Sequence, residues 1–93
     1  MIISFADKET LRVSAGERSR SLPSEIQKRA RDRLRMIDAA DHLEDLRSPP
    51  GNRLYALKEN RIGQHSVSIN DQWRICFVWK DGDAHDVEII DYH

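Results

Sequence analysis

The residues best suited to chemistry lie in the second half of the chain. An apolar run ends directly in Asp91-Tyr92-His93, and the cations Lys58 and Arg74 occur in earlier apolar segments. Histidine titrates near neutral pH, so His93 can serve as a general acid or base. Asp91 can orient that imidazole or act as the base itself. Lys58 and Arg74 can hold a phosphate, the arginine through two parallel hydrogen bonds.

These are the residue types that RNA cleavage without a metal requires. The 2′-hydroxyl must lose its proton, the charge of the phosphorane must be neutralised, and the 5′-oxygen must be protonated or stabilised. Tyr92 can stack on a nucleobase, which is a common way to hold single-stranded RNA. The sequence leaves open which group is the acid and which the base. Each residue also has a plain reading: a C-terminal histidine as a frayed tail, and a strand lysine or arginine as a solvated side chain.

The first half of the chain predicts helices. Residues 2–5 are short and apolar and can form an edge strand, and residues 7–13 can form a short helix with Asp7 as its N-cap. Residues 24–40 give the clearest helix, because apolar residues recur there at spacings of four, four and three. Ser24 and Gln27 resemble a capping box at its start, beside Pro23. The apolar stripe consists of Ile26, Ala30, Leu34 and Ile37.

After the breaker at residues 48–52 the period changes to two, which predicts strands at 54–58, 64–70, 73–80 and 84–90. A three-residue loop, Lys80-Asp81-Gly82, keeps one face of the last hairpin apolar and places Arg74 opposite Glu88. The expected architecture is a single α+β domain over residues 1–93, with helices packed on one face of a small antiparallel sheet. Its expected core includes four residues of the strands: His65, Trp73, Phe77 and Trp79.

Composition excludes several classes of protein. The chain has 93 residues, 39% of them hydrophobic and 33% charged, which is ordinary for a water-soluble domain. No apolar run approaches the roughly 20 residues that span a bilayer, and no secretory signal is recognisable. The one cysteine, Cys76, excludes an internal disulfide and is expected to be inert. The spacing of His85, Asp86, Asp91 and His93 matches no standard zinc pattern.

Charge is unevenly distributed although the net charge is only −1. From residue 12 to residue 35 there are eight basic and three acidic residues, a local excess of +5. This stretch can be a solvated helix face, a surface that contacts ribosomal RNA through its phosphates, or a docking surface for a protein partner. The sequence does not choose between these three.

Several spaced motifs resemble those of the HigB-type, plasmid-maintenance "killer" toxins of the RelE/ParE superfamily. The motifs are Leu57 to Ser66 (LKENRIGQHS), Asn70 to Phe77 (NDQWRICF) and the terminal Asp91-Tyr92-His93. The connection from Arg47 to Leu54 also resembles the subgroup that includes the GraT toxin. The resemblance covers nearly the whole chain, and its second half is the specific part.

The resemblance implies a bacterial, cytoplasmic toxin that cuts mRNA in the decoding site of the ribosome without a metal or other cofactor. It implies a helix-turn-helix antitoxin of the HigA type as partner, contact with operator DNA only through that antitoxin, and no association with membranes. The implied catalytic residues are Lys58, Arg74, Asp91, Tyr92 and His93, and the expected RNA-binding residues are Tyr55 and Arg61.

One position departs from the family pattern, since many members carry a histidine where this chain has Tyr55. Tyr55 can stack on a base or fill space. Two other classes of function also remain open. One is an inhibitor that acts by binding, like the superfamily members that poison DNA gyrase, or on a ribosome-associated target. The other is a relic that serves only as corepressor with its antitoxin.

Overall fold

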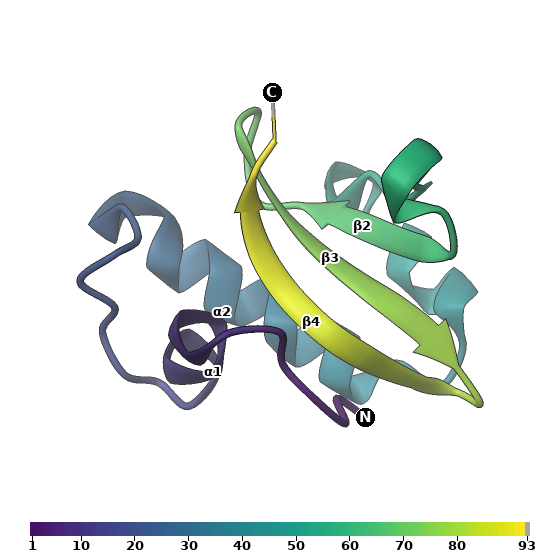
Figure 1. The fold of residues 1–93 in the computed structure, drawn as a ribbon, viewed down its shortest axis with the longest axis horizontal. Helices are drawn as coiled ribbons and strands as arrows, with labels where there is room; N and C mark the ends of the chain where they lie inside the picture. The colour runs from purple at the N-terminus through teal and green to yellow at the C-terminus, as the bar shows by residue number, and fades with distance from the viewer. Residues whose placement is uncertain (93) are drawn as a thin grey trace.

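The computed structural model describes residues 1–92, in which a four-stranded antiparallel sheet follows two helices. The helices are α1 (Lys8–Ser14) and α2 (Ser24–Ala39), and short 3-10 helices follow them: η1 (Leu43–Arg47), η2 (Pro50–Asn52) and η3 (Glu59–Arg61). The strands β1 (Tyr55–Ala56), β2 (Gln64–Ser68), β3 (Trp73–Lys80) and β4 (Asp83–Asp91) lie in this order across the sheet (Figure 1). The predicted α+β class, with helices packed on one face of an antiparallel sheet, is confirmed.

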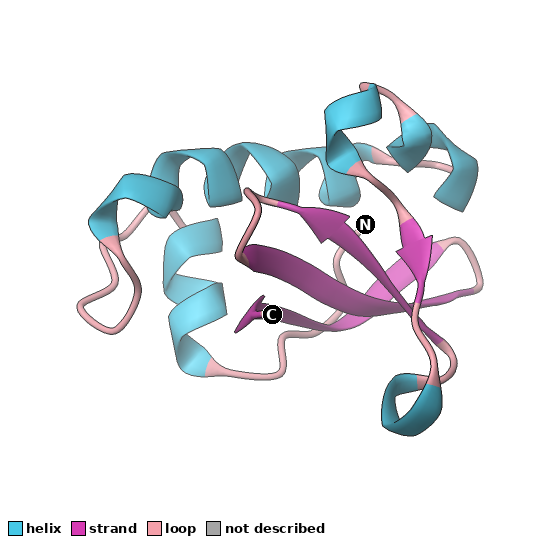
Figure 2. Cartoon of the chain, turned by 90° about the horizontal axis from the view of Figure 1, so that it is seen from above, coloured by secondary structure: helices cyan, strands magenta, loops and turns pink. Residues whose placement is uncertain are grey.

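Helix α2 covers one face of the sheet. Its predicted apolar stripe is buried, and it packs against Ile75 and Phe77 of β3 and Val87 of β4. Burying each such side chain contributes roughly 1.5–3 kcal/mol to the stability of the fold. Figure 2 shows α2 running along one side of the sheet, while the single turn that follows β1 lies on the other side. The face opposite α2 therefore carries the residues that alternate with the core residues.

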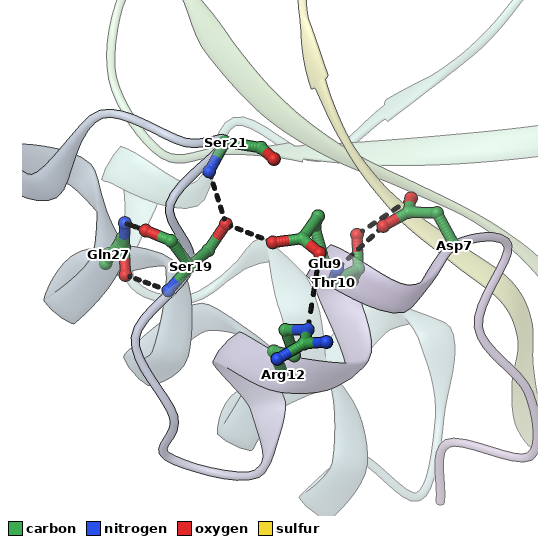
Figure 3. Close-up of polar contacts among 7 residues, drawn as sticks. All are labelled: Asp7, Glu9, Thr10, Arg12, Ser19, Ser21 and Gln27. Carbon is green, nitrogen blue, oxygen red and sulfur yellow. Dashed lines mark hydrogen bonds and ion pairs between the residues drawn. The ribbon is translucent and has the colours of Figure 1, made fainter.

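A polar network orders the connection between α1 and α2 (Figure 3). Gln27 holds Ser19 from both sides: its Oε1 accepts from the Ser19 N–H at 3.0 Å, and its Nε2 donates to the Ser19 carbonyl at 2.8 Å. The Ser19 hydroxyl donates to Glu9 on α1 at 2.6 Å. Gln27 thus ties the connecting loop to α2 by hydrogen bonds. The predicted capping box of Ser24 and Gln27 is wrong, because Pro23 is the N-cap of α2 and no side chain caps this helix. Asp7 caps α1 as predicted.

The hairpin between β3 and β4 has a two-residue turn, so the predicted three-residue loop is wrong. Asp81 and Gly82 both have positive φ, 53° and 80°, as a type I′ turn requires, and Lys80 pairs with Asp83. This turn alone would place apolar residues of β3 opposite acidic residues of β4.

A bulge in β4 restores the apolar pairing. Asp86, with φ of 52°, is the extra residue, and beyond it Ile75 pairs with Ile89 and Arg74 pairs with Ile90, not with Glu88. The N-terminal segment holds the bulge, because the Asp86 N–H donates to the Ser4 hydroxyl at 2.9 Å. That segment runs parallel to the outer edge of β4 but forms only isolated bridges, at Ile2 and Phe5, in place of the predicted strand.

The other predicted strands agree with the structure to within a few residues, although β1 is only two residues long. Among residues 1–92, no helix has the length and apolar character that crossing a membrane requires.

His65, which the sequence predicts as a core residue, is only partly buried and lies outside the core cluster, and its buried Nδ1 has no hydrogen-bond partner in the described part of the chain. The prediction of a satisfied core histidine is therefore wrong in this respect. The ring stacks on Phe77 with centroids 6.4 Å apart. Burial, and secondly the nearby charge of Arg47, lowers the pKa of His65 below its ordinary value of 6.5.

This lowered pKa predicts a pH-dependent stability. Between the folded pKa of His65 and about 6.5, the unfolded chain binds more protons, so the free energy of unfolding rises with pH and this contribution is complete above about 6.5. We expect His65→Leu to remove that part of the slope when unfolding in urea is measured from pH 5 to pH 8. An unchanged slope in the variant would assign the pH dependence to other groups.

Candidate active site

Arg74 is the centre of the face opposite α2. Its neighbours Ile75 and Trp73 point toward the core side, so alternation places Arg74 on the other face, where it is nevertheless 92% buried (8% exposed). Its Nε donates to the Ser66 hydroxyl at 2.8 Å, and its Nη2 donates to the Arg53 carbonyl at 2.6 Å. These two hydrogen bonds fix the guanidinium in place. Within residues 1–92, Nη1 makes no hydrogen bond, so one donor group remains free.

Two tyrosine rings flank the guanidinium of Arg74. The carbon Cζ of Arg74 lies 5.0 Å from the ring centroid of Tyr55 and 5.8 Å from that of Tyr92. Both rings are about half exposed. Burial lowers the pKa of Arg74, and the nearby Cys76 and tyrosines oppose that shift. Arginine still carries its charge at neutral pH, because its ordinary pKa lies far above neutrality.

A pocket of about 410 Å³ opens beside Arg74. Lys58 lines it from the segment between β1 and η3, where its side chain is exposed and has no ion pair among the described residues. The pocket thus combines a fixed buried cation, an exposed cation without an ion pair among residues 1–92, and two aromatic rings. The full set of lining residues is Tyr55, Ala56, Leu57, Lys58, Glu59, Ser66, Arg74 and Tyr92. Such a set can bind a phosphate and the nucleobases on either side of it.

Asp91 does not line this pocket. It lines a neighbouring hollow of about 490 Å³ together with Arg61, Ile90 and Tyr92, and its Oδ2 accepts a hydrogen bond from Gln72. Tyr92 therefore lies between the two hollows. The structure brings together four predicted residues, Tyr55, Lys58, Arg74 and Tyr92, and places Asp91 and Arg61 beside them. His93 lies outside the described residues.

Arg61, the second expected RNA-binding residue, is already paired. Its Nη1 lies 3.1 Å from a carboxylate oxygen of Glu88 on β4 and donates to Gln64 at 3.0 Å. Cys76 lies on the same face, and burial raises the pKa of its thiol, which keeps the sulfur protonated and supports the prediction that it is inert. Within residues 1–92, no three His, Cys, Asp or Glu side chains gather in a way that could hold a metal ion.

Most cations of the basic stretch are engaged within the fold. Arg29 and Arg33 of α2 donate to the carbonyls of Ile69 and Ser68 at the end of β2, at 3.3 and 3.1 Å. Arg31 donates to the carbonyl of Val13 in α1 at 3.3 Å. In the described chain, three cations of this stretch have no such partner: Arg18, Arg20 and Lys28. The local excess of positive charge is therefore in large part structural.

Three contributors to the site were missed by sequence reasoning. Ser66 was part of a quoted motif but received no role, although it lies diagonally across the β2–β3 ladder from Arg74. The Arg53 carbonyl is aimed at Arg74 by a left-handed backbone (φ of 45°), which no side-chain pattern reveals. Glu59 lines the pocket beside Lys58. Cross-strand diagonals could have found Ser66 once the β2–β3 register was known.

Known proteins identify the family of this chain. The family model described as "RelE-like toxin of type II toxin-antitoxin system HigB" matches residues 3–93. The chain belongs to this HigB-like toxin family. Two relatives agree with that assignment. Toxin HigB-1 of Vibrio cholerae serotype O1 is 43% identical over 68 residues, which cover 73% of this chain and 72% of the relative.

The second relative carries an activity in its name. Endoribonuclease HigB of Proteus vulgaris is 35% identical over 72 residues, which cover 77% of each chain. As a HigB-like toxin, this protein belongs to a toxin–antitoxin system and so has an antitoxin as its counterpart. The sequence resemblance to HigB-type toxins is thereby confirmed.

Proposed function

We propose that this HigB-like toxin is an mRNA endoribonuclease that acts on the ribosome and so stops translation and growth. The observation that carries the proposal is the pocket in which buried Arg74, exposed Lys58 and the rings of Tyr55 and Tyr92 meet. Membership of the family and the name of the Proteus vulgaris relative support the same reaction.

In the proposed reaction the 2′-oxygen of a nucleotide attacks the adjacent phosphorus, and the bond to the 5′-oxygen breaks. One group removes the 2′-proton and another delivers a proton to the leaving 5′-oxygen, which yields a 2′,3′-cyclic phosphate and a 5′-hydroxyl end. Nη1 of Arg74 and the ammonium of Lys58 offset the charge that develops on the phosphate oxygens. Tyr55 and Tyr92 hold flanking bases by stacking.

His93 and Asp91 are the proposed proton-transfer groups, with the assignment of acid and base left to experiment. Asp91 lines the neighbouring hollow, which shares Tyr92 with the phosphate pocket. Such a small site gains much from external positioning of the RNA, which is the physical reason to place the reaction on the ribosome.

We further propose that the antitoxin of this protein is a helix-turn-helix protein of the HigA type. The toxin would contact operator DNA only through that antitoxin, and both would act in the bacterial cytoplasm.

Mapping of RNA ends tests the proposal directly. A defined mRNA is incubated with the toxin, with and without programmed ribosomes, and new ends are located by primer extension. We expect ends that appear only with ribosomes and that disappear with His93→Ala. If no ends appear while induction of the toxin without its antitoxin still arrests growth, the protein inhibits by binding, and the nuclease proposal is wrong.

A further inference from the structure

A carboxylate lines the pocket whose other charged groups are cations. Glu59 lies beside Lys58 and shares the pocket with Arg74 and the two tyrosines. Its side chain is exposed, and within residues 1–92 it makes no ion pair or hydrogen bond. A negative charge at this point repels the phosphate that the cations attract. Glu59 therefore does not contribute to phosphate binding, and its place in the pocket suits a different contact with the substrate.

The backbone of Glu59 is held in an unfavourable conformation. Its φ of 58° lies in the left-handed region, which costs roughly 1–2 kcal/mol for a residue with a side chain. Glycine would adopt this conformation without that cost. Glu59 is the first residue of η3, directly after the edge strand β1, so the strain fixes the start of this turn at the rim of the pocket.

The chemistry of a carboxylate limits what Glu59 can recognise. An ionised carboxylate only accepts hydrogen bonds, so its partners must be donors. On the edge of an unpaired nucleobase, the exocyclic amino groups of adenine, cytosine and guanine are such donors, whereas uracil has no amino group and its only edge donor, N3–H, is flanked by two carbonyl oxygens that repel a carboxylate. Tyr55 and Tyr92 line the same pocket and offer the stacking surface that would turn the edge of a base toward the rim.

We propose that Glu59 is a specificity-determining residue that selects, at the nucleotide bound in this pocket, bases that carry an amino group. The proposal rests on the nuclease function proposed above and names the feature of the substrate that this site reads. The carboxylate accepts a hydrogen bond from the amino group, and the repulsion of phosphate at this rim disfavours binding of the backbone in the same place. Uracil lacks the amino group and turns two carbonyl oxygens toward the carboxylate, so it is cut more slowly.

Changes of a single functional group in the RNA provide the test. After the cleavage site is mapped, each nucleotide around it is replaced in turn, adenosine by purine riboside, which lacks only the amino group, and cytidine by uridine. The full-length toxin, Glu59→Gln and the control Glu17→Gln, which removes the same charge from an exposed glutamate of the α1–α2 connection, are compared on programmed ribosomes. Rates are measured in single turnover across pH 6 to pH 9.

At one position we expect the toxin and Glu17→Gln to cut the RNA with the amino-bearing base about tenfold faster than the RNA with the substituted base. A factor of this size corresponds to one hydrogen bond to a charged group. Glu59→Gln should reduce this preference to less than about twofold. Glu59→Gly should also lose the preference while its unfolding temperature rises, because glycine relieves the backbone strain.

Three results would overturn the inference. The first is a preference in Glu59→Gln equal to that of the toxin. The second is the absence of any preference in the toxin itself. The third is an equal loss of rate on every RNA with a changed pH profile, which would make Glu59 a proton-transfer group. Failure of the toxin to cut any RNA is a different result, since it overturns the nuclease function and the inference with it.

Discussion

Arg74→Lys should reduce RNA cleavage by about 100-fold while the protein stays folded. Lysine retains the positive charge but cannot donate to Ser66 and to the Arg53 carbonyl and still present a third donor group to the phosphate. The lost geometry, not the lost charge, is thus responsible for the expected effect. Cleavage in single turnover on a mapped mRNA measures it, and thermal unfolding reports whether the fold is retained.

A matched control is available on the other face of the sheet. Arg33→Lys also replaces an arginine that donates to a backbone carbonyl, but Arg33 is half-buried, lies on α2 and does not line the pocket. We expect it to shift the unfolding temperature by a similar amount and to leave cleavage within about twofold. Equal cleavage by Arg74→Lys and Arg33→Lys would remove Arg74 from the reaction.

Lys58→Met should reduce cleavage by about 100-fold with almost no change in stability. The side chain is exposed and unpaired in the described chain, so its removal leaves no buried partner behind, and surface substitutions of this kind usually change stability by less than about 0.5 kcal/mol. Lys58→Arg should retain most of the activity, because here a flexible charge is needed and not a fixed geometry.

The control for this variant is Lys80→Met, at the exposed end of β3 beside the turn. It removes the same charge away from the pocket, so any general effect of charge on RNA attraction appears in both variants. If Lys58→Met and Lys80→Met lose the same small amount of activity, Lys58 contributes only to long-range attraction.

The extent to which sequence predicts this protein depends on the range of the interaction. The α2 stripe and the alternation of β3 follow from local periodicity, so their bounds agree with the structure closely. Asp7 was predictable as a cap because the capping bond spans three residues. The two hydrogen bonds between Gln27 and the backbone of Ser19 were not predictable from the sequence. A Gln27 side chain that suits a local capping box binds the N–H and carbonyl of a residue eight positions away instead.

The site follows the same rule. Lys58, Arg74 and Tyr92 were found because the family motif names them, whereas Tyr55 departs from it. The position of Tyr92 beside Arg74 depends on the register of β4, which a single residue changes. The bulge at Asp86 has no strong signal in the sequence, since aspartate adopts positive φ less readily than glycine and the tertiary bond to Ser4 stabilises it. Without the bulge, alternation would exchange the faces of Tyr92 and Asp91.

The position of β4 in the chain also bears on the order of events during synthesis. Among the described elements β4 comes last, yet the N-terminal segment bridges to it at Ile2 and Phe5, and Tyr92, which lines the pocket, directly follows it. Segments made early must therefore wait for the last strand, because domains close as units once their pairing partners have emerged. A nascent chain cannot complete this pocket while Tyr92 is still inside the ribosome, so we expect the proposed activity toward RNA only after that residue has left the machine that made it.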